Sequence, residues 1–243
     1  GGDPGWRGHR GRIEQHRVDA HAAGVRWTGC FTHMHSADEG RATVDGQWRR
    51  LQEALGGVRR PEGEFLVHGL NSAASLRCPE YGADLVRPGI FLYGGRAGAD
   101  QPAPEEVASV RARVVHVRPA PEGTTLGYGS TYRSRGDERW ATVAMGYGDG
   151  LPRALGNRGH ALVGGKRVPI IGRISMDVSV VDITHVAGVR PGDVATFIGT
   201  DGDERISVDE VADLMGTISY EILTGFTPRV VRIWTDGSAA GGS

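Results

Sequence analysis

The chain has 243 residues, a formal net charge of −1 and a pI of about 6.8. This balance gives no electrostatic basis for binding nucleic acid or an anionic membrane surface, and no apolar run approaches the roughly 20 residues of a transmembrane helix. Two cysteines, Cys30 and Cys78, are too few for a disulfide scaffold, and the first residues lack a signal-peptide pattern, so we expect a cytoplasmic protein.

The first hundred residues alternate between helical and strand-like segments. In chain order these are a helix over 12–24, a strand over 25–32, a helix over 39–55, a strand over 65–68, a short helix over 71–77 and a third strand near Leu85. Such alternation predicts β/α units that share a parallel sheet. A stretch rich in proline, glycine and alanine over 94–104 then marks a domain boundary.

Beyond the boundary, short β-branched runs lie between turns of glycine, proline and aspartate, which predicts a compact all-β domain. The runs cover 110–117, 140–145, 161–163, 168–171, 178–183 and 194–198. Gly164-Gly165 predicts a hairpin turn. Ser207 and Glu210 form a capping-box pattern that opens a helix ending at Met215.

The lengths of the two parts set the expected architecture. A closed (β/α)8 barrel needs about 250 residues, and the first part is much shorter. We therefore expect an α/β plus all-β chain, in which a partial (β/α)8 TIM barrel over residues 1–100 precedes a β-strand-rich domain over 106–236 and a disordered tail over 237–243. On this interpretation the chain is an N-terminally incomplete enzyme.

Two turns in the first part present groups that suit a phosphate. Asn71 and Ser72 are ordinary N-cap residues, but the Ser72 hydroxyl and nearby N–H groups also suit a phosphate at the positive end of a helix. Gly89 and Ile90 would add further backbone N–H donors, although Gly89 also fits a plain turn. Turns of this kind at the C-terminal ends of strands are the usual phosphate sites of β/α barrels.

Four later segments extend the pattern. They are Gly127-Tyr128-Gly129-Ser130-Thr131-Tyr132, Gly146-Tyr147-Gly148-Asp149-Gly150, Ile174-Ser175-Met176-Asp177 and Ile218-Ser219-Tyr220-Glu221. With the His68–Gly94 stretch, they make the chain resemble the pyridoxal 5′-phosphate-dependent alanine racemases over roughly residues 25–236. The resemblance implies interconversion of L- and D-alanine by two-base proton transfer, D-alanine supply for peptidoglycan, and a homodimer whose active sites are shared between subunits.

The resemblance also implies a role for each matching residue. The cofactor-binding residues would be Ser72, Gly89, Ile90, Tyr220, His68, Asn71 and Arg87. The catalytic residues would be Tyr128, His33 and Arg87, and the substrate would meet Tyr147 and Met176. Taken alone, Arg87 is an ordinary salt-bridge partner. In the resemblance it faces the pyridine nitrogen and lies between His33 and His68 in a hydrogen-bonded line, which would give Tyr128, as a base, a positive neighbour.

The chain departs from the family pattern in two places. The cofactor bonds to a lysine on the first barrel strand, but the single lysine here is Lys166, in the predicted Gly-Gly hairpin. Around Asp3 and Gly5 the spacing slips by a residue, so either Arg7 or Arg10 would replace the arginine that binds the substrate carboxylate.

Three alternatives stand beside this interpretation. A serine or broad-specificity amino-acid racemase fits equally, since Ser175 does not decide the substrate. A non-catalytic truncated remnant that dimerises through the β domain is the second. The third is a metal site at Thr32-His33-Met34-His35, which we do not expect because the two histidines lack a third ligand nearby.

Overall fold

The structure is a computed structural model that describes residues 9–56 and 65–235, without the side chains of residues 9–14 and 17. The chain divides into two compact units, Gly1–Glu105 and Glu106–Ser243. The segment around Asp3 and Arg7, the side chain of Arg10 and the predicted tail over 237–243 lie outside the described residues. In the described ranges no helix is long and apolar enough to cross a membrane.

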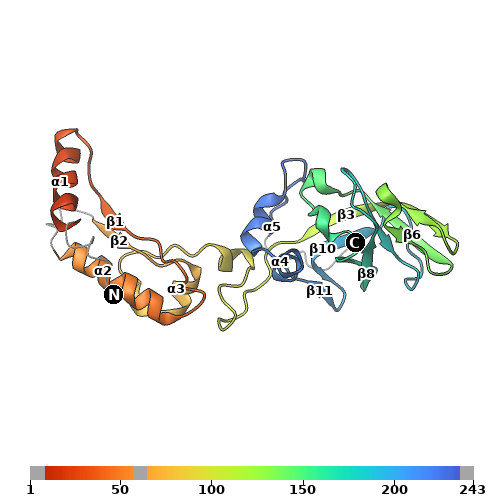
Figure 1. Cartoon of the computed structure of the whole chain (residues 1–243), viewed down its shortest axis with the longest axis horizontal. Coiled ribbons are helices and arrows are strands. Elements are labelled where there is room, and N and C mark those ends of the chain that lie inside the picture. The colour runs from red at the N-terminus through yellow and green to blue at the C-terminus, as the bar shows by residue number, and fades with distance from the viewer. Residues whose placement is uncertain (1–8, 57–64, 236–243) are drawn as a thin grey trace. The chain divides into compact units, whose positions relative to one another are not determined.

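The first unit has a small parallel sheet with helical connections, as the sequence predicts. Strands β1 (Gly29–Phe31) and β2 (Leu66–His68) pair in parallel, from Gly29↔Leu66 to Phe31↔His68. Helices α1 (His9–Ala22), α2 (Arg41–Leu55) and α3 (Ser72–Arg77) accompany them (Figure 1). Leu51 and Leu55 on α2 pack against Phe65 and Val67, so the inward stripe of this helix forms the small core beside the strands.

The predicted third strand near Leu85 is wrong. Leu85 forms only an isolated parallel bridge with His68. The Asp84 carboxylate accepts a hydrogen bond from the Val67 N–H at 2.8 Å. A side-chain oxygen therefore takes the position that a backbone carbonyl oxygen would have if a third strand paired with β2. Pro88 follows soon after and has no N–H to extend a strand.

The second unit is an antiparallel sheet whose strands run in the order β11-β10-β3-β6-β9-β8-β7. Their bounds are β3 Val110–Ala120, β6 Glu138–Val143, β7 His160–Val163, β8 Lys166–Ile171, β9 Ser179–Asp182, β10 Val194–Asp201 and β11 Glu204–Ile206. Strand β10 also pairs with β7, through Ala195↔Val163 and Thr196↔Leu162, which closes six of these strands into a barrel. The predicted all-β character is confirmed.

The local turn signal is also confirmed, and of the predicted capping box the serine half is confirmed. Gly164 and Gly165 have φ of +59° and +71° and join β7 to β8 as a two-residue hairpin. The Ser207 hydroxyl accepts the Glu210 N–H at 3.0 Å and caps α4 (Val208–Met215). The Glu210 carboxylate pairs with Arg167 on β8, so in this helix the serine supplies the cap.

The sequence did not indicate several short elements. These are β4 Thr125–Leu126, β5 Tyr132–Arg133 and α5 Ser219–Gly225, besides single 3-10 turns such as Tyr128–Ser130 and Tyr147–Asp149. Two-residue strands carry too few side chains to show a periodic pattern.

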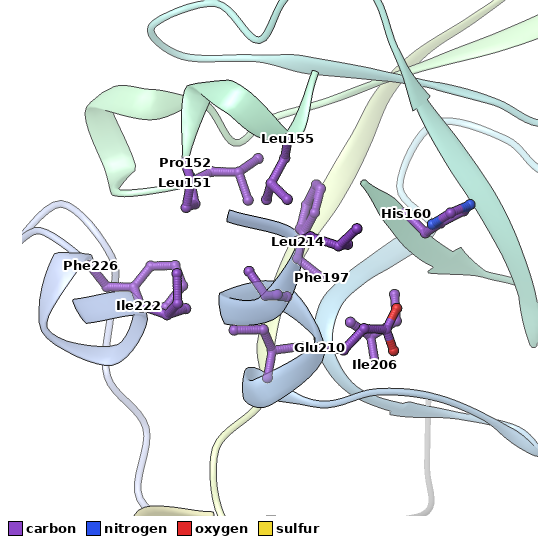
Figure 2. A pocket seen from close by; sticks show the side chains of 12 residues that line it. Leu151, Pro152, Leu155, His160, Phe197, Ile206, Glu210, Leu214, Ile222 and Phe226 are labelled. Carbon is purple, nitrogen blue, oxygen red and sulfur yellow. The ribbon is translucent and has the colours of Figure 1, made fainter. Parts of the chain in front are cut away.

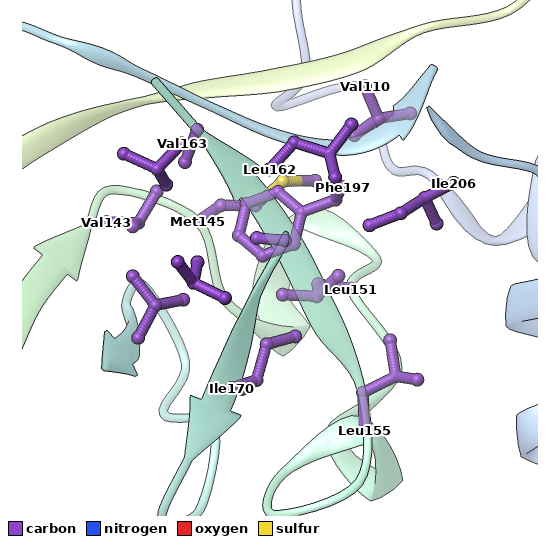
Figure 3. Packing of buried hydrophobic residues seen from close by; sticks show 14 of the residues in the cluster. Val110, Val143, Met145, Leu151, Leu155, Leu162, Val163, Ile170, Phe197 and Ile206 are labelled. Atoms are coloured by element: carbon purple, nitrogen blue, oxygen red, sulfur yellow. The ribbon is translucent and has the colours of Figure 1, made fainter. Parts of the chain in front are cut away.

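Inward-facing apolar side chains fill the barrel. Phe197 lies at the centre of the cluster with Leu162, Ile170 and Met145 around it (Figure 3). Helices α4 and α5 add to the same core, and a shallow apolar hollow remains between them and the 3-10 turn Arg153–Leu155 (Figure 2). Most of its lining belongs to the core packing of the unit, and His160 and Glu210 are its polar members.

We expect Phe197→Ala to destabilise the second unit by about 3–5 kcal/mol, because it leaves a cavity in a closed barrel. Urea unfolding, followed through strand amide resonances by NMR, measures the change. Val231→Ala is the matched control, since Val231 is 80% exposed and its loss should cost within about 0.5 kcal/mol. Equal costs for the two variants would contradict the core assignment.

Candidate active site

Ser72 joins the two turns that the sequence singled out in the first unit. It is the first residue of α3 and is buried, and its hydroxyl oxygen accepts N–H groups from Gly89 at 2.8 Å and Phe91 at 3.4 Å. Asn71 serves as the N-cap, accepting the Ala74 N–H at 3.1 Å. The donors at the start of α3 and those of the Gly89–Ile90 turn therefore lie side by side. The Asn71 side chain caps α3.

Backbone donors around Ser72 remain available. Within the described residues, the N–H groups of Ser72, Ala73 and Ile90 have no hydrogen-bond acceptor. A Cβ placed on Gly89 would meet no atom within 4 Å, so the space beside this backbone is open. Unpaired N–H groups beside a hydroxyl are the donors that suit an anion, and we call this group of donors around Ser72 the cradle.

Arg87 is held over the ends of β1 and β2. Its guanidinium donates to the Thr32 carbonyl oxygen at 2.9 Å and contacts Nδ1 of His68. The Phe31 ring lies 5.4 Å from the guanidinium carbon and stacks on the His68 ring, with centroids 5.4 Å apart. An arginine can only donate, so Nδ1 of His68 accepts and its proton lies on Nε2.

The surroundings of His68 favour its neutral form. Burial lowers the pKa of His68, and the positive charge of Arg87 lowers it further. Since the pKa is lower in the folded chain than in the unfolded one, folding disfavours the protonated ring. The contribution of His68 to stability therefore falls as the pH drops below the ordinary histidine value.

Of the predicted hydrogen-bonded line through His33, Arg87 and His68, the described residues show the Arg87–His68 part. The structure brings Arg87 to His68, whereas His33 is exposed and, among the described residues, makes no hydrogen bond with Arg87. The described part of the chain also contains no group of three or more His, Cys, Asp or Glu side chains placed to hold a metal ion.

Tyr128 lies in the second unit on a glycine-flanked turn. Gly127 and Gly129 have φ of +66° and +73°, a region that favours glycine, and the Tyr128 side chain is 71% exposed. The Arg173 guanidinium packs against Gly129, since a Cβ there would lie 3.1 Å from its Nη1. Arg173 was not recognisable in the sequence, because no local pattern links positions so far apart.

Tyr147 and Met176 lie on two loops that pair along their backbones. The Tyr147 N–H donates to the Ser175 carbonyl oxygen at 3.0 Å, and the Gly148 N–H donates to the Met176 carbonyl oxygen at 2.8 Å. Both side chains are partly exposed, at 41% and 51%. The Met176 N–H has no acceptor in the described chain, so the paired loops present a tyrosine hydroxyl and a backbone donor.

The candidate Tyr220 and the single lysine, Lys166, lie elsewhere in the second unit. Tyr220 is the second residue of α5 and its side chain is about half exposed. Lys166 begins β8 directly after the Gly164-Gly165 turn and is exposed. Its amine therefore lies at a hairpin end, in a different unit from Ser72 and Arg87.

We expect Arg87→Gln to raise the pKa of His68 part of the way towards its ordinary value, since burial, the larger cause, remains. NMR titration of the imidazole resonances between pH 4 and pH 8 measures it. Arg49→Gln, which changes an exposed arginine on α2, is the matched control. If His68 titrated identically in both variants, the charge of Arg87 would have no part in its state.

Comparisons with known proteins cover both units. Residues 107–234 match the alanine racemase C-terminal domain, and residues 14–97 match the alanine racemase N-terminal domain. An alanine racemase of Sorangium cellulosum is 40% identical over 222 residues, which are 87% of this chain and 58% of that protein. One of Halothermothrix orenii is 37% identical over 86% of this chain and 56% of that protein. The chain thus spans a little more than half the length of these relatives.

Solved structures agree with the sequence relatives. The alanine racemase of Streptomyces coelicolor A3(2) superposes with a TM-score of 0.85 at 32% identity, covering 97% of this chain and 63% of that one. That of Bartonella henselae, solved with covalently bound pyridoxal phosphate, gives 0.79 at 29% identity, covering 90% of this chain and 60% of that one. With a family domain matched over more than half of its residues, the chain belongs to the alanine racemase family.

Proposed function

We propose that the polypeptide containing this chain is a cytoplasmic alanine racemase that interconverts L- and D-alanine with pyridoxal 5′-phosphate and supplies D-alanine for peptidoglycan. The observation that carries the proposal is the cradle in the first unit. There a buried hydroxyl, Ser72, lies beside N–H groups of Ser72, Ala73 and Ile90 that find no acceptor in the described part of the chain. Membership of the family supports the same assignment.

The phosphate and ring ends of pyridoxal phosphate fit the residues present. The cradle offers N–H donors and open space beside Gly89, which suits a dianionic phosphate. We propose the Tyr220 hydroxyl as a further phosphate ligand. When bound, the cofactor supplies an electron-withdrawing ring that stabilises negative charge at the substrate α-carbon.

The aldehyde end of the cofactor needs a lysine amine. Lys166 does not suit this task, because its side chain is exposed at the end of the β7–β8 hairpin, where none of the described residues encloses the amine. We propose that polypeptide other than residues 1–243 supplies this lysine.

Arg87 sets the electronic character of the proposed site. Its guanidinium would face the pyridine nitrogen as a hydrogen-bond donor and, because it does not give up a proton, would leave that nitrogen unprotonated. This role of Arg87 would weaken electron withdrawal by the ring and disfavour side reactions such as transamination. His68 and the Thr32 carbonyl oxygen hold Arg87 in place for this role.

The proposed proton transfers use one base on each face of the substrate. The Tyr128 oxygen removes or returns the α-proton on one face, and the external lysine serves the other. The Met176 N–H binds the substrate carboxylate, with Tyr147 beside it. We propose a homodimer in which Tyr128 and Met176 serve the active site of the partner subunit.

We expect Ser72→Ala to weaken binding of pyridoxal phosphate to the chain about fivefold to a hundredfold, because one hydroxyl and the placement of the Gly89 N–H are lost. The shift of the Ile90 amide resonance on titration reports the affinity, and pyridoxal without phosphate should bind weakly to both proteins. Ser75→Ala is the matched control, since the Ser75 hydroxyl on the same helix is buried without a hydrogen-bond partner. Equal affinities in all three proteins would exclude the cradle.

We expect Tyr128→Phe to slow proton abstraction from one enantiomer by about 10²- to 10⁴-fold, and far more than from the other. The test uses the chain joined to the lysine-bearing barrel segment of a relative, with α-deuterium isotope effects and solvent-proton exchange measured for L- and D-alanine. Forward and reverse rates stay balanced at equilibrium, so the equilibrium constant does not change.

Tyr93→Phe is the control for this experiment, because Tyr93 is an exposed tyrosine without a proposed role. Unchanged exchange for both enantiomers would remove Tyr128 from the mechanism. Absence of D-alanine formation by the joined parent protein would overturn the proposed function.

A further inference from the structure

A turn near the end of the described chain is fastened to the loop that carries Tyr147. The Val230 N–H donates to the Thr227 carbonyl oxygen at 3.1 Å and closes the turn. Thr227 then bonds twice to the glycine loop, since its N–H donates to the Asp149 carbonyl oxygen at 3.1 Å and its hydroxyl to the Gly148 carbonyl oxygen at 3.0 Å. Arg229, in the middle of the turn, is therefore held beside this loop.

Arg229 reaches both of the loops that present candidate substrate groups. Its Nε lies 3.1 Å from Oδ1 of Asp149, in the Tyr147 loop, and its Nη2 lies 2.6 Å from Oδ1 of Asp177, in the Met176 loop. The hydrogen bond to Asp177 and the charge of Asp149 both raise the pKa of Arg229. The second oxygen of Asp149 accepts the Gly146 N–H at 2.9 Å, so this carboxylate orders its own loop as well.

The bridge explains why glycine recurs in the Tyr147 loop. A Cβ on Gly148 would lie 2.5 Å from Nη1 of Arg229, and one on Gly146 would overlap the Ser175 carbonyl oxygen. Side chains at these positions would separate the loops or displace the guanidinium. The Gly-Tyr-Gly-Asp-Gly motif is thus built for close approach on both sides of Tyr147.

We propose that Arg229 is a positioning residue that locks the Tyr147 loop to the Met176 loop, so that the Tyr147 hydroxyl and the Met176 N–H meet the substrate at a fixed separation. The substrate part of this inference rests on the proposed function. Arg229 is 49% exposed, so each ion pair alone is worth little. The combined effect comes from joining two loops through one planar group, which a lysine cannot reproduce because it offers a single charged point.

Hydrogen exchange on the whole chain tests the lock directly. In Arg229→Gln we expect the protection of the Tyr147 and Gly148 amides, whose hydrogen bonds cross between the loops, to fall at least about tenfold. Arg229→Lys should keep part of the protection, and the Val181 amide in β9 should keep all of it. Arg190→Gln is the matched control, because Arg190 is 84% exposed and its ion-pair partner among the described residues is Asp193, at 3.9 Å.

Two exchange results would overturn the proposal. One is unchanged protection of the two loop amides in Arg229→Gln. The other is an equal loss at Val181, which would show general destabilisation of the unit instead of a local lock.

A carboxylate probe separates this inference from the proposed function. Propionate is titrated into each protein while the Met176 amide resonance is followed. Binding that weakens at least about tenfold in Arg229→Gln and is partly restored in Arg229→Lys supports positioning. Equal binding by the parent and Arg229→Gln overturns it. A parent that does not bind propionate refutes the carboxylate role proposed for Met176, and the exchange data alone then decide whether Arg229 locks the loops.

Discussion

The pairing of β10 with β7 is the constraint on which the second unit depends. It closes six antiparallel strands, so none of them keeps a free edge, and the buried Ala195, Leu162 and Val163 lie at this seam. Closure also places the loops. Because β6 and β9 are antiparallel with Val143 opposite Ser179, the chain leaving β6 and the chain entering β9 meet at the same end of the barrel. Tyr147 and Met176 are neighbours for this reason.

The first unit has no comparable closure in its described residues. Two short parallel strands and one bridge form its sheet, and the ends of these strands are connected through Arg87. The Arg87 N–H donates to the Leu70 carbonyl oxygen at 2.8 Å, while its guanidinium reaches Thr32 and His68. The same group that would face a pyridine ring therefore also fixes the local backbone. A substitution there alters the chemistry and the geometry of the site together.

The sequence revealed the features that depend on neighbouring residues. The helix capped by Asn71, the Gly164-Gly165 hairpin and the Ser207 cap each need only a few adjacent side chains, and all three form. The strand predicted near Leu85 failed, because the outcome depended on a side-chain contact from Asp84 to Val67. Periodicity carries no information about such a contact.

In the candidate site, too, the residues that belong to local motifs could be predicted from the sequence, and those that act through distant contacts could not. Glycine-rich turns with Ser72, Tyr128 and Tyr147 are visible as motifs, and the family resemblance gave them roles. Arg173 and Arg229 were not visible, since each acts on a loop far away in the sequence. The glycines they pack against were the only trace of them, and a glycine alone does not reveal what approaches it.

Arginine is the basic residue that this chain uses to join distant segments. Arg77 binds the Ala37 and Asp38 carbonyl oxygens and both oxygens of Asp100, while Arg167 reaches Glu210 and the Arg205 carbonyl oxygen. Each of these links needs several donors in one plane, which an ammonium group does not provide. The choice also has a chemical consequence, because an aldehyde cofactor reacts with amines and not with guanidinium groups held in ion pairs. With Lys166 as its single side-chain amine, exposed at a hairpin, the chain offers an aldehyde cofactor almost no competing partner among its own side chains.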